Sequence, residues 1–255
     1  MNQKPETGNQ KRLFGLIGYP LSHSFSQKYF TEKFKRENIA DCEFKNFSLV
    51  DIDRLPELLK ENPSLCGLSI TIPHKQGIMK LLNSIDPAAR EIGAVNCVSI
   101  SRGSLKGYNT DIVGFEHSLK PLLQSDQRKA LVLGTGGAAK AVTYVLRKLG
   151  IEFQSVSRSK GDLLYSGITP SIIKDHSLIV NTTPLGMFPN LYECPDIPYA
   201  SLSPAHLLYD LTYNPEESLF LKKGKEQGAR IKNGLEMLHA QAEAAWKIWN
   251  QTSEK

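Results

Sequence analysis

The sequence predicts an α/β fold made of two α/β domains. Strand-like apolar runs alternate with segments of helical periodicity along the whole chain, which is typical of mostly parallel sheets. The alternation occurs twice, and the polar, linker-like stretch "QSDQRK" (124–129) lies between the two. In the second alternation a glycine-rich turn directly follows a strand and opens a helix, which is typical of a Rossmann-type domain.

The first alternation is built from short apolar strands, one of which, "LCGLSITI" (65–72), is apolar enough to be buried on both faces. The stretch 94–111 predicts a hairpin with Arg102-Gly103 at its turn. Further strands are expected at 12–18 and 42–50, and helices at 24–38, 52–59 and 75–83.

The second alternation, together with the helix that precedes the polar stretch 124–129, predicts five strands and four helices. The segment 161–176 is short for a full crossover helix. Strands are expected at 130–134, 152–157, 177–183, 207–213 and 229–234, and helices at 111–123, 137–150, 216–227 and 234–250.

The composition is that of a globular protein with a sizeable core: 255 residues, 40% hydrophobic and 22% charged. No run of 18 apolar residues exists, so no membrane span is expected, and the polar stretch 1–11 is interpreted as a flexible leader. The four cysteines form no C-x-x-C pair and the six histidines no ligand pattern, so no metal is expected. We expect a cytoplasmic protein.

The net charge of +5 is mildly basic. Its densest cluster, "KFKRE" (33–37), falls on a predicted helix without the aromatic–basic repeats that accompany nucleic-acid sites. A solvated helix face is therefore the favoured interpretation, and no nucleic-acid partner is expected. A modest positive field would still suit small anionic ligands.

The turn "ALVLGTGGAAKAV" (130–142) is the strongest local signal. Gly134, Gly136 and Ala139 fit G-x-G-x-x-G/A, in which the glycines allow a tight turn and a close approach of pyrophosphate to the backbone. Free N–H groups at the start of the helix would bind the phosphates. A glycine-rich loop without a ligand is the alternative, but the strand–turn–helix context favours a dinucleotide.

The end of the next predicted strand, 152–157, indicates whether the dinucleotide is NAD or NADP. NAD-binding units usually place Asp or Glu there, whereas this chain has Ser157-Arg158-Ser159 followed by Lys160. Arg158 could pair with a 2′-phosphate and stack on adenine, so NADP is preferred. The loop "NTTPLGM" (181–187) follows another strand and is interpreted as lying under the nicotinamide ribose.

Several polar residues of the first domain have ordinary explanations when taken singly. Ser22 and Ser24 precede a helix and Asp111 opens one, so each could be a cap, and Asn96 could be a turn amide. Lys75 follows the buried strand 65–72 by a Pro-containing turn and could be a solvated lysine.

Taken together, eight motifs in order resemble the shikimate dehydrogenase family: "YPLSHSFSQ", "SITIPHKQ", "IGAVNCV", "GYNTDIVGF", "LGTGGAAKAV", "NTTPLGM", "YDLTYNP" and "NGLEMLHAQA". The resemblance covers the chain from about residue 13 to residue 250. It implies NADP-dependent, reversible reduction of 3-dehydroshikimate to shikimate, in the shikimate pathway of aromatic amino-acid and chorismate biosynthesis.

The resemblance also implies a domain plan with a cleft. A substrate-binding catalytic domain would comprise 12–110 and 236–255, with the last helix returning to it, and an NADP-binding domain would comprise 111–235. The partners would be a small-molecule substrate and NADP, in a monomer or homodimer.

The resemblance assigns site residues by motif. Lys75 and Asp111 would be the catalytic pair, in which we expect Asp111 to position the lysine and the reacting hydroxyl. The substrate hydrogen-bonders would be Ser22, Ser24, Thr71, Asn96, Tyr213 and Gln241. The cofactor contacts would be Gly134, Gly136, Gly137, Ala138, Ser157, Arg158, Leu211, Gly234 and Met237.

The chain also departs from the family pattern. Many family members carry a second arginine a few residues after the one that corresponds to Arg158. In this chain that place is near Asp162, and only Lys160 adds positive charge. Glu236 stands where glycine is common in the family. The missing second arginine favours one alternative, a quinate/shikimate dehydrogenase accepting NAD or NADP. A non-catalytic protein that senses a metabolite or NADP also stays open.

Overall fold

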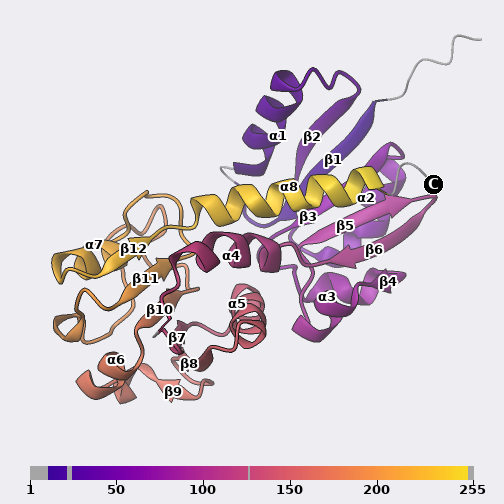
Figure 1. Ribbon diagram of the computed structural model, residues 1–255. Helices are drawn as coiled ribbons and strands as arrows, with labels where there is room; N and C mark the ends of the chain where they lie inside the picture. The colour runs from indigo at the N-terminus through magenta and orange to yellow at the C-terminus, as the bar shows by residue number, and fades with distance from the viewer. Residues whose placement is uncertain (1–10, 22–24, 126, 252–255) are drawn as a thin grey trace, which may run out of the picture. The chain divides into compact units, whose positions relative to one another are not determined.

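The computed structural model describes residues 11–21, 25–125 and 127–251, and the proposed leader 1–11 lies almost wholly outside this range (Figure 1). The chain divides into two compact units. The N-terminal unit comprises Met1–Asn109 with Ala245–Lys255, and the second unit comprises Thr110–Ala244. The second of these boundaries falls inside the last helix, nine residues after the start of the returning segment expected from the sequence.

The N-terminal unit contains a six-stranded sheet in the order β2-β1-β3-β5-β6-β4. Its core of β1, β2 and β3 is parallel, and β5 runs antiparallel to both β3 and β6. The strands are β1 (Arg12–Gly18), β2 (Cys42–Ser48), β3 (Leu65–Ile70), β4 (Ser84–Ile85), β5 (Cys97–Ser101) and β6 (Ser104–Tyr108).

The predicted hairpin is formed by β5 and β6, and its turn lies at Arg102-Gly103 as expected. Both turn residues have positive φ, 49° and 75°, which matches the twist of the flanking strands. The helices of this unit are α1 (Phe25–Arg36), α2 (Leu55–Glu61) and α3 (Pro87–Ile92).

The helix expected at 75–83 is wrong in type. The segment forms a 3₁₀ helix, η2 (Gly77–Leu81), in which Ile78 is buried. A five-residue segment that begins with glycine has low α-helical propensity, so the shorter 3₁₀ form is adopted.

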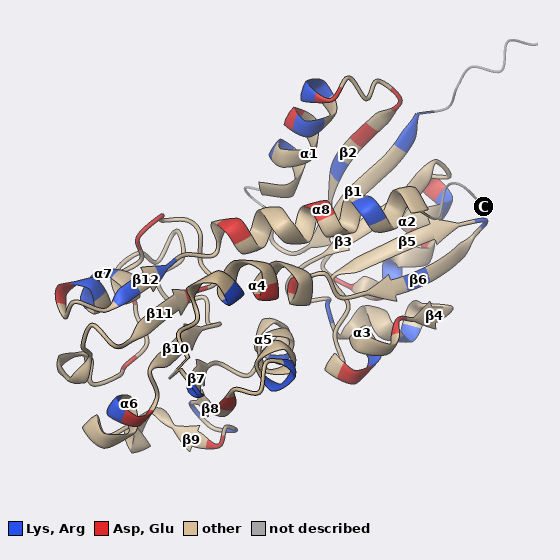
Figure 2. Cartoon of the chain, viewed as in Figure 1, with Lys and Arg blue, Asp and Glu red and all other residues tan. Residues whose placement is uncertain are grey.

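Acidic and basic side chains both lie along α1, and Glu37 pairs with two cations of the basic cluster at the end of the helix (Figure 2). Lys33 is 4% exposed and pairs with Glu37 at 2.9 Å, and the same carboxylate lies 3.2 Å from Arg36. The sequence interpretation of a fully solvated face is therefore wrong for Lys33, whose stem packs inward while its ammonium meets Glu37.

Aromatic side chains form one core of the N-terminal unit. Trp249, on the last helix α8 (Leu235–Gln251), is fully buried, stacks on Phe14 at 5.1 Å between centroids and donates from Nε1 to the carbonyl of Val98 at 3.0 Å. The indole lies directly over Gly67 of β3, where an added Cβ would be 2.4 Å from Trp249 Cδ1. Gly67 is therefore required for this close approach.

The second unit is a wholly parallel sheet in the order β12-β11-β10-β7-β8-β9. Read from the other edge, this is the doubly wound order 3-2-1-4-5-6. The strands are β7 (Lys129–Leu133), β8 (Glu152–Ser157), β9 (Leu163–Leu164), β10 (Leu178–Asn181), β11 (Leu207–Asp210) and β12 (Arg230–Lys232).

Helices cover both faces of this sheet, and alternate residues of β7 face opposite cores. Ala130 and Val132 join one core with Phe115, while Leu131 and Leu133 join the other. The first core is covered by α4 (Asp111–Leu119), α5 (Gly137–Lys148) and the start of α8, and the second by α6 (Pro170–Asp175) and α7 (Leu219–Glu226) (Figure 1).

The connection between β8 and β10 is short, as the sequence analysis noted. The crossover after β8 contains only the two-residue β9, a 3₁₀ turn η4 (Tyr165–Gly167) and the six-residue α6, in keeping with the short segment noted there. Within the described part of the chain, no helix has the length and apolarity needed to cross a bilayer. The remaining short 3₁₀ turns are η1 (Ile52–Arg54), η3 (Lys120–Leu122) and η5 (Tyr199–Ser201).

The contact between Gly67 and Trp249 yields a stability prediction. Gly67→Ala places a methyl group against a fully buried ring that has no room to move, so we expect a loss of roughly 1–3 kcal/mol in the free energy of unfolding. Gly167→Ala is the matched control, because nothing lies within 4 Å of its added Cβ. Urea unfolding of both variants tests this; equal stability of the two would contradict it.

Candidate functional site

In the N-terminal unit, three sequence-predicted residues lie on backbone segments that are bonded to one another. Thr71 directly follows β3, and Lys75 follows in the next turn. The amide of Ile70 donates to the carbonyl of Asn96 at 2.8 Å, and the amide of Val95 donates to the carbonyl of Lys75 at 2.7 Å. Thr71, Lys75 and Asn96 are thus held close to one another at the carboxyl end of β3.

His74 fixes the turn that presents Lys75. Its ring is 5% exposed, and Nε2 lies 2.6 Å from the carbonyl oxygen of Leu49. Its amide also donates to the Thr71 carbonyl at 2.9 Å. His74 is buried, whereas Lys75, the next residue, is only half-buried and keeps part of its surface exposed to solvent. The sequence analysis missed His74, although it stands inside the quoted motif.

Asn109 is a second residue of this region that sequence reasoning missed. It is 5% exposed, and its Nδ2 donates to the carbonyl of Ala94 at 2.9 Å. The side chain therefore ties the end of the hairpin to the segment that carries Asn96. Ser22 and Ser24 lie outside the described residues.

In the second unit, the glycine turn lies at the switch point of the sheet, where β7 is flanked by β8 and β10. Gly134 has φ 113°, and its amide donates to the carbonyl of Val156 at 2.8 Å. An added Cβ would lie 2.6 Å from Thr182 Oγ1, so only glycine fits. Gly136 is the N-cap of α5 with open space where a Cβ would be, and no acidic residue occupies the first turn. This arrangement leaves the helix N-terminus accessible to an anion.

The loop after β8 is organised by Ser157. Its Oγ accepts from the amides of Ser159 and Lys160 at 3.1 and 2.6 Å, which curls the loop and leaves Arg158 exposed. Asp162 accepts from the amide and hydroxyl of Ser155, both at 2.7 Å, and these bonds lower the pKa of its carboxyl. The carboxylate of Asp162 is therefore held against β8.

Leu211 and Gly234 meet in direct contact. An added Cβ on Gly234 would lie 2.0 Å from the Leu211 carbonyl oxygen, and the Gly234 amide donates to the carbonyl of Thr212 at 3.0 Å. Tyr213 follows in the same loop, half-buried, and burial raises the pKa of its phenol.

Asp111 and Gln241 belong to helices of the second unit. Asp111 is the first residue of α4 and is 3% exposed, at a helix end that favours a carboxylate, while Thr110 provides no side-chain cap. Gln241 lies on α8 beside Gly114 of α4, and Met237 is 6% exposed in the core next to Phe115. Lys75 and Asp111 thus belong to different units.

Asp210 is a buried acid that the sequence analysis did not single out. It ends β11, is fully buried, and accepts from Asn181 Nδ2 at 3.1 Å, the Thr212 amide at 2.9 Å and Ser218 Oγ at 2.5 Å. Burial raises the pKa of its carboxyl to about 6 in spite of these bonds, because the charged form loses its hydration.

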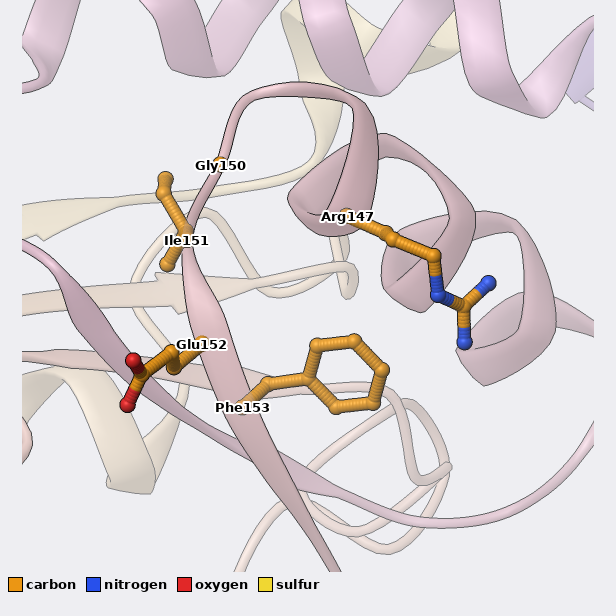
Figure 3. A pocket seen from close by; sticks show the side chains of 5 residues that line it. All are labelled: Arg147, Gly150, Ile151, Glu152 and Phe153. Atoms are coloured by element: carbon orange, nitrogen blue, oxygen red, sulfur yellow. The ribbon is translucent and has the colours of Figure 1, made fainter.

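One pocket of the second unit lies away from the residues described above, and no metal-ligand cluster accompanies them in the described residues. A surface pocket is lined by Arg147, Gly150, Ile151, Glu152 and Phe153 (Figure 3). It lies where β8 begins, at the opposite end of the strands from the glycine turn. Within residues 11–21, 25–125 and 127–251, no three His, Cys, Asp or Glu side chains gather as metal ligands.

The strand order, the glycine turn and the separate N-terminal sheet define a class: two-domain α/β proteins with a Rossmann-type dinucleotide-binding domain. The family model of the shikimate dehydrogenase substrate-binding domain matches residues 16–98. The NADP(+) shikimate dehydrogenase of Carboxydothermus hydrogenoformans is 35% identical over 268 residues, covering 96% of this chain and 93% of that protein.

Solved structures agree with this match. The shikimate dehydrogenase of Aquifex aeolicus has a TM-score of 0.82 at 32% identity, covering 95% of this chain and 93% of that one. The enzyme of Thermus thermophilus, in complex with NADP(H) and shikimate, has a TM-score of 0.82 at 29% identity, covering 93% and 92%. This chain belongs to the shikimate dehydrogenase family, as the sequence motifs indicated.

The raised pKa of Asp210 predicts a pH dependence of stability. The folded-state pKa of about 6 lies above the ordinary 3.8, so this group stabilises the folded state below pH 4, and its contribution falls as the pH rises through about 6. The full loss would be about 3 kcal/mol. Asp210→Asn removes the titrating group, so the difference in unfolding free energy, wild type minus variant, should decrease between pH 4.5 and 7.5. Parallel pH profiles in urea unfolding would refute this assignment.

Proposed function

We propose that this chain catalyses the reversible, NADPH-dependent reduction of 3-dehydroshikimate to shikimate, in the shikimate pathway of aromatic amino-acid biosynthesis. The observation that carries the proposal is the 35% identity to an NADP(+) shikimate dehydrogenase over 96% of the chain. The glycine turn and the loop at Arg158 support a dinucleotide with a 2′-phosphate. The proposed reaction makes the protein an oxidoreductase acting on a CH–OH group.

The residues of the second unit fit NADP(H). The open N-terminus of α5, with Gly136, Gly137 and Ala138, would hold the pyrophosphate through backbone N–H groups. Ser157 shapes the loop that carries Arg158 and Lys160, whose charges would hold the 2′-phosphate. Leu211, Gly234 and Met237 would bound the nicotinamide end. When bound, the cofactor supplies the hydride.

The polar residues assigned by the family motifs would orient the substrate. A ring with one carboxylate and several hydroxyls needs many neutral donors and acceptors, and a buried set of these can reject an analogue lacking one hydroxyl. Ser22, Ser24, Thr71, Asn96, Tyr213 and Gln241 are the proposed set. The backbone bonds that join the Thr71, Lys75 and Asn96 segments would hold part of it rigid.

Lys75 would donate the proton in the reduction and accept it in the oxidation. As the ketone carbon gains hydride, its oxygen develops negative charge, which the Lys75 ammonium would stabilise and then protonate from Nζ. In the oxidation direction, the neutral amine would take the hydroxyl proton. Asp111 would be the partner of Lys75 and would orient both the lysine and the reacting hydroxyl.

A quinate/shikimate dehydrogenase that accepts NAD or NADP is the second candidate. It is favoured by the loop after β8, where Arg158 has no second arginine after it and Asp162 is bound to Ser155. Rates with shikimate and quinate, each with NADP and NAD, separate the two candidates. Absence of any NADPH oxidation with 3-dehydroshikimate would favour the non-catalytic sensor. The cytoplasmic location and the oligomeric state stay predictions.

If Lys75 is the proton donor, its removal should lower the turnover number and leave substrate binding nearly unchanged. Lys75→Ala should lower kcat by roughly 10²–10⁴-fold with little change in the KM for substrate, because it removes the proton donor rather than the binding groups. Lys80→Ala is the matched control, since Lys80 is exposed, lies on the adjacent η2 and pairs with Asp53. Near-normal turnover of Lys75→Ala in steady-state assays would rule the role out.

The role of Arg158 predicts a change in cofactor preference. Arg158→Ala should raise the KM for NADPH by about tenfold and the KM for NADH by much less, since the 2′-phosphate loses a charged partner while NADH loses only the stacking on adenine. Arg147→Ala controls for charge, because Arg147 is an exposed arginine at the opposite end of the same sheet (Figure 3). An equal effect on both cofactors would count against the assignment.

A further inference from the structure

Asp210 is a buried acid whose partners are all neutral. Its three hydrogen bonds come from an amide side chain, a backbone amide and a hydroxyl, and the residue has no exposed surface. Burying a carboxyl group in this way is unfavourable unless it is fully hydrogen-bonded, and an apolar side chain would avoid that cost. Its presence at the carboxyl end of β11 therefore calls for a function.

One side of the network leads into the loop after β10. Asn181 donates to Asp210, and its Oδ1 accepts from both the amide and the hydroxyl of Thr183, at 3.0 and 2.6 Å. Thr183 Oγ1 in turn accepts from the Leu185 amide at 3.3 Å. The carboxylate thus fixes the first half of the loop 181–187 through a chain of side chains.

The other side leads into the loop after β11. The Thr212 amide donates to Asp210, which fixes the peptide that follows Leu211, and the Thr212 carbonyl accepts from the Gly234 amide. Ser218, the third donor, is the N-cap of α7, and its Oγ also accepts from Leu221. One carboxylate therefore joins the loop after β10, which lies 29 residues earlier in the sequence, to the loop after β11 and to the start of α7.

We propose that Asp210 is a positioning residue that sets the nicotinamide half of the cofactor site, acting through Asn181 on the loop 181–187 and through Thr212 on Leu211 and Gly234. The proposal rests on the proposed function, in which this edge of the sheet binds NADPH. It assigns no contact with cofactor or substrate to Asp210, since the residue is fully buried and both carboxyl oxygens are occupied.

The geometry favours this role over a purely structural one. Thr182, between the two network residues of the loop, donates to the Leu133 carbonyl at 2.7 Å and lies against Gly134 of the phosphate-binding turn. The network and the glycine turn are therefore contiguous at the switch point. A residue that only stabilised the core would have no reason to connect the loops at the ligand-binding end of the strands.

The test uses the full chain with Asp210→Asn and Asn181→Ala, and Thr169→Ala as the matched control. Thr169 caps α6 through its Oγ1 and has no bond to the network, so its loss lowers stability alone. We measure the Kd for NADPH by calorimetry, the KM values for NADPH and 3-dehydroshikimate, kcat and Tm.

Both network variants should raise the Kd and KM for NADPH by about tenfold, with a change of less than about threefold in the KM for 3-dehydroshikimate. Thr169→Ala should lower Tm and leave NADPH binding unchanged. Wild-type NADPH affinity in both network variants overturns the proposal, as does an equal loss in Thr169→Ala. If Asp210→Asn fails to fold, Asn181→Ala alone decides. A wild-type chain that binds no NADPH refutes the proposed function instead.

Discussion

The close approach of Gly134 to Thr182 is the constraint on which the arrangement of the second unit depends. The turn after β7 can lie against the loop after β10 only because residue 134 has no Cβ and adopts a φ of 113°. That contact places the N-terminus of α5 at the switch point of the sheet, where open α/β sheets bind their ligands. A side chain at residue 134 would separate the two loops.

The N-terminal unit uses backbone hydrogen bonds for the same purpose. The segment 94–96 is bonded to the end of β3, to the carbonyl of Lys75 and, through Asn109, to the end of the hairpin. Lys75 is thereby presented from a turn whose neighbours on both sides are fixed. Such rigidity is what proton transfer to a small substrate requires, since the reacting groups must be held within hydrogen-bond distance.

Much of the fold could be predicted from sequence, because local patterns decide it. The glycine turn, the hairpin at Arg102-Gly103 and the parallel strands each have a short-range signal. The type of η2 and the burial of Lys33 could not be predicted, since both depend on tertiary packing. Asp210 and Asn181 lie 29 residues apart and Asn109 bonds to Ala94, so only the fold brings these partners together. The assigned roles of Lys75 and Asp111 rest on family resemblance.

In the proposed function, Lys75 is the proton donor of a site that reduces 3-dehydroshikimate with NADPH. The most direct measurement is the rate of NADPH oxidation by the purified chain with 3-dehydroshikimate, compared between the wild type and Lys75→Ala. We expect substrate-dependent oxidation by the wild type and a kcat lower by roughly 10²-fold or more in the variant. No oxidation by the wild type, or equal rates for the two proteins, would contradict this proposal.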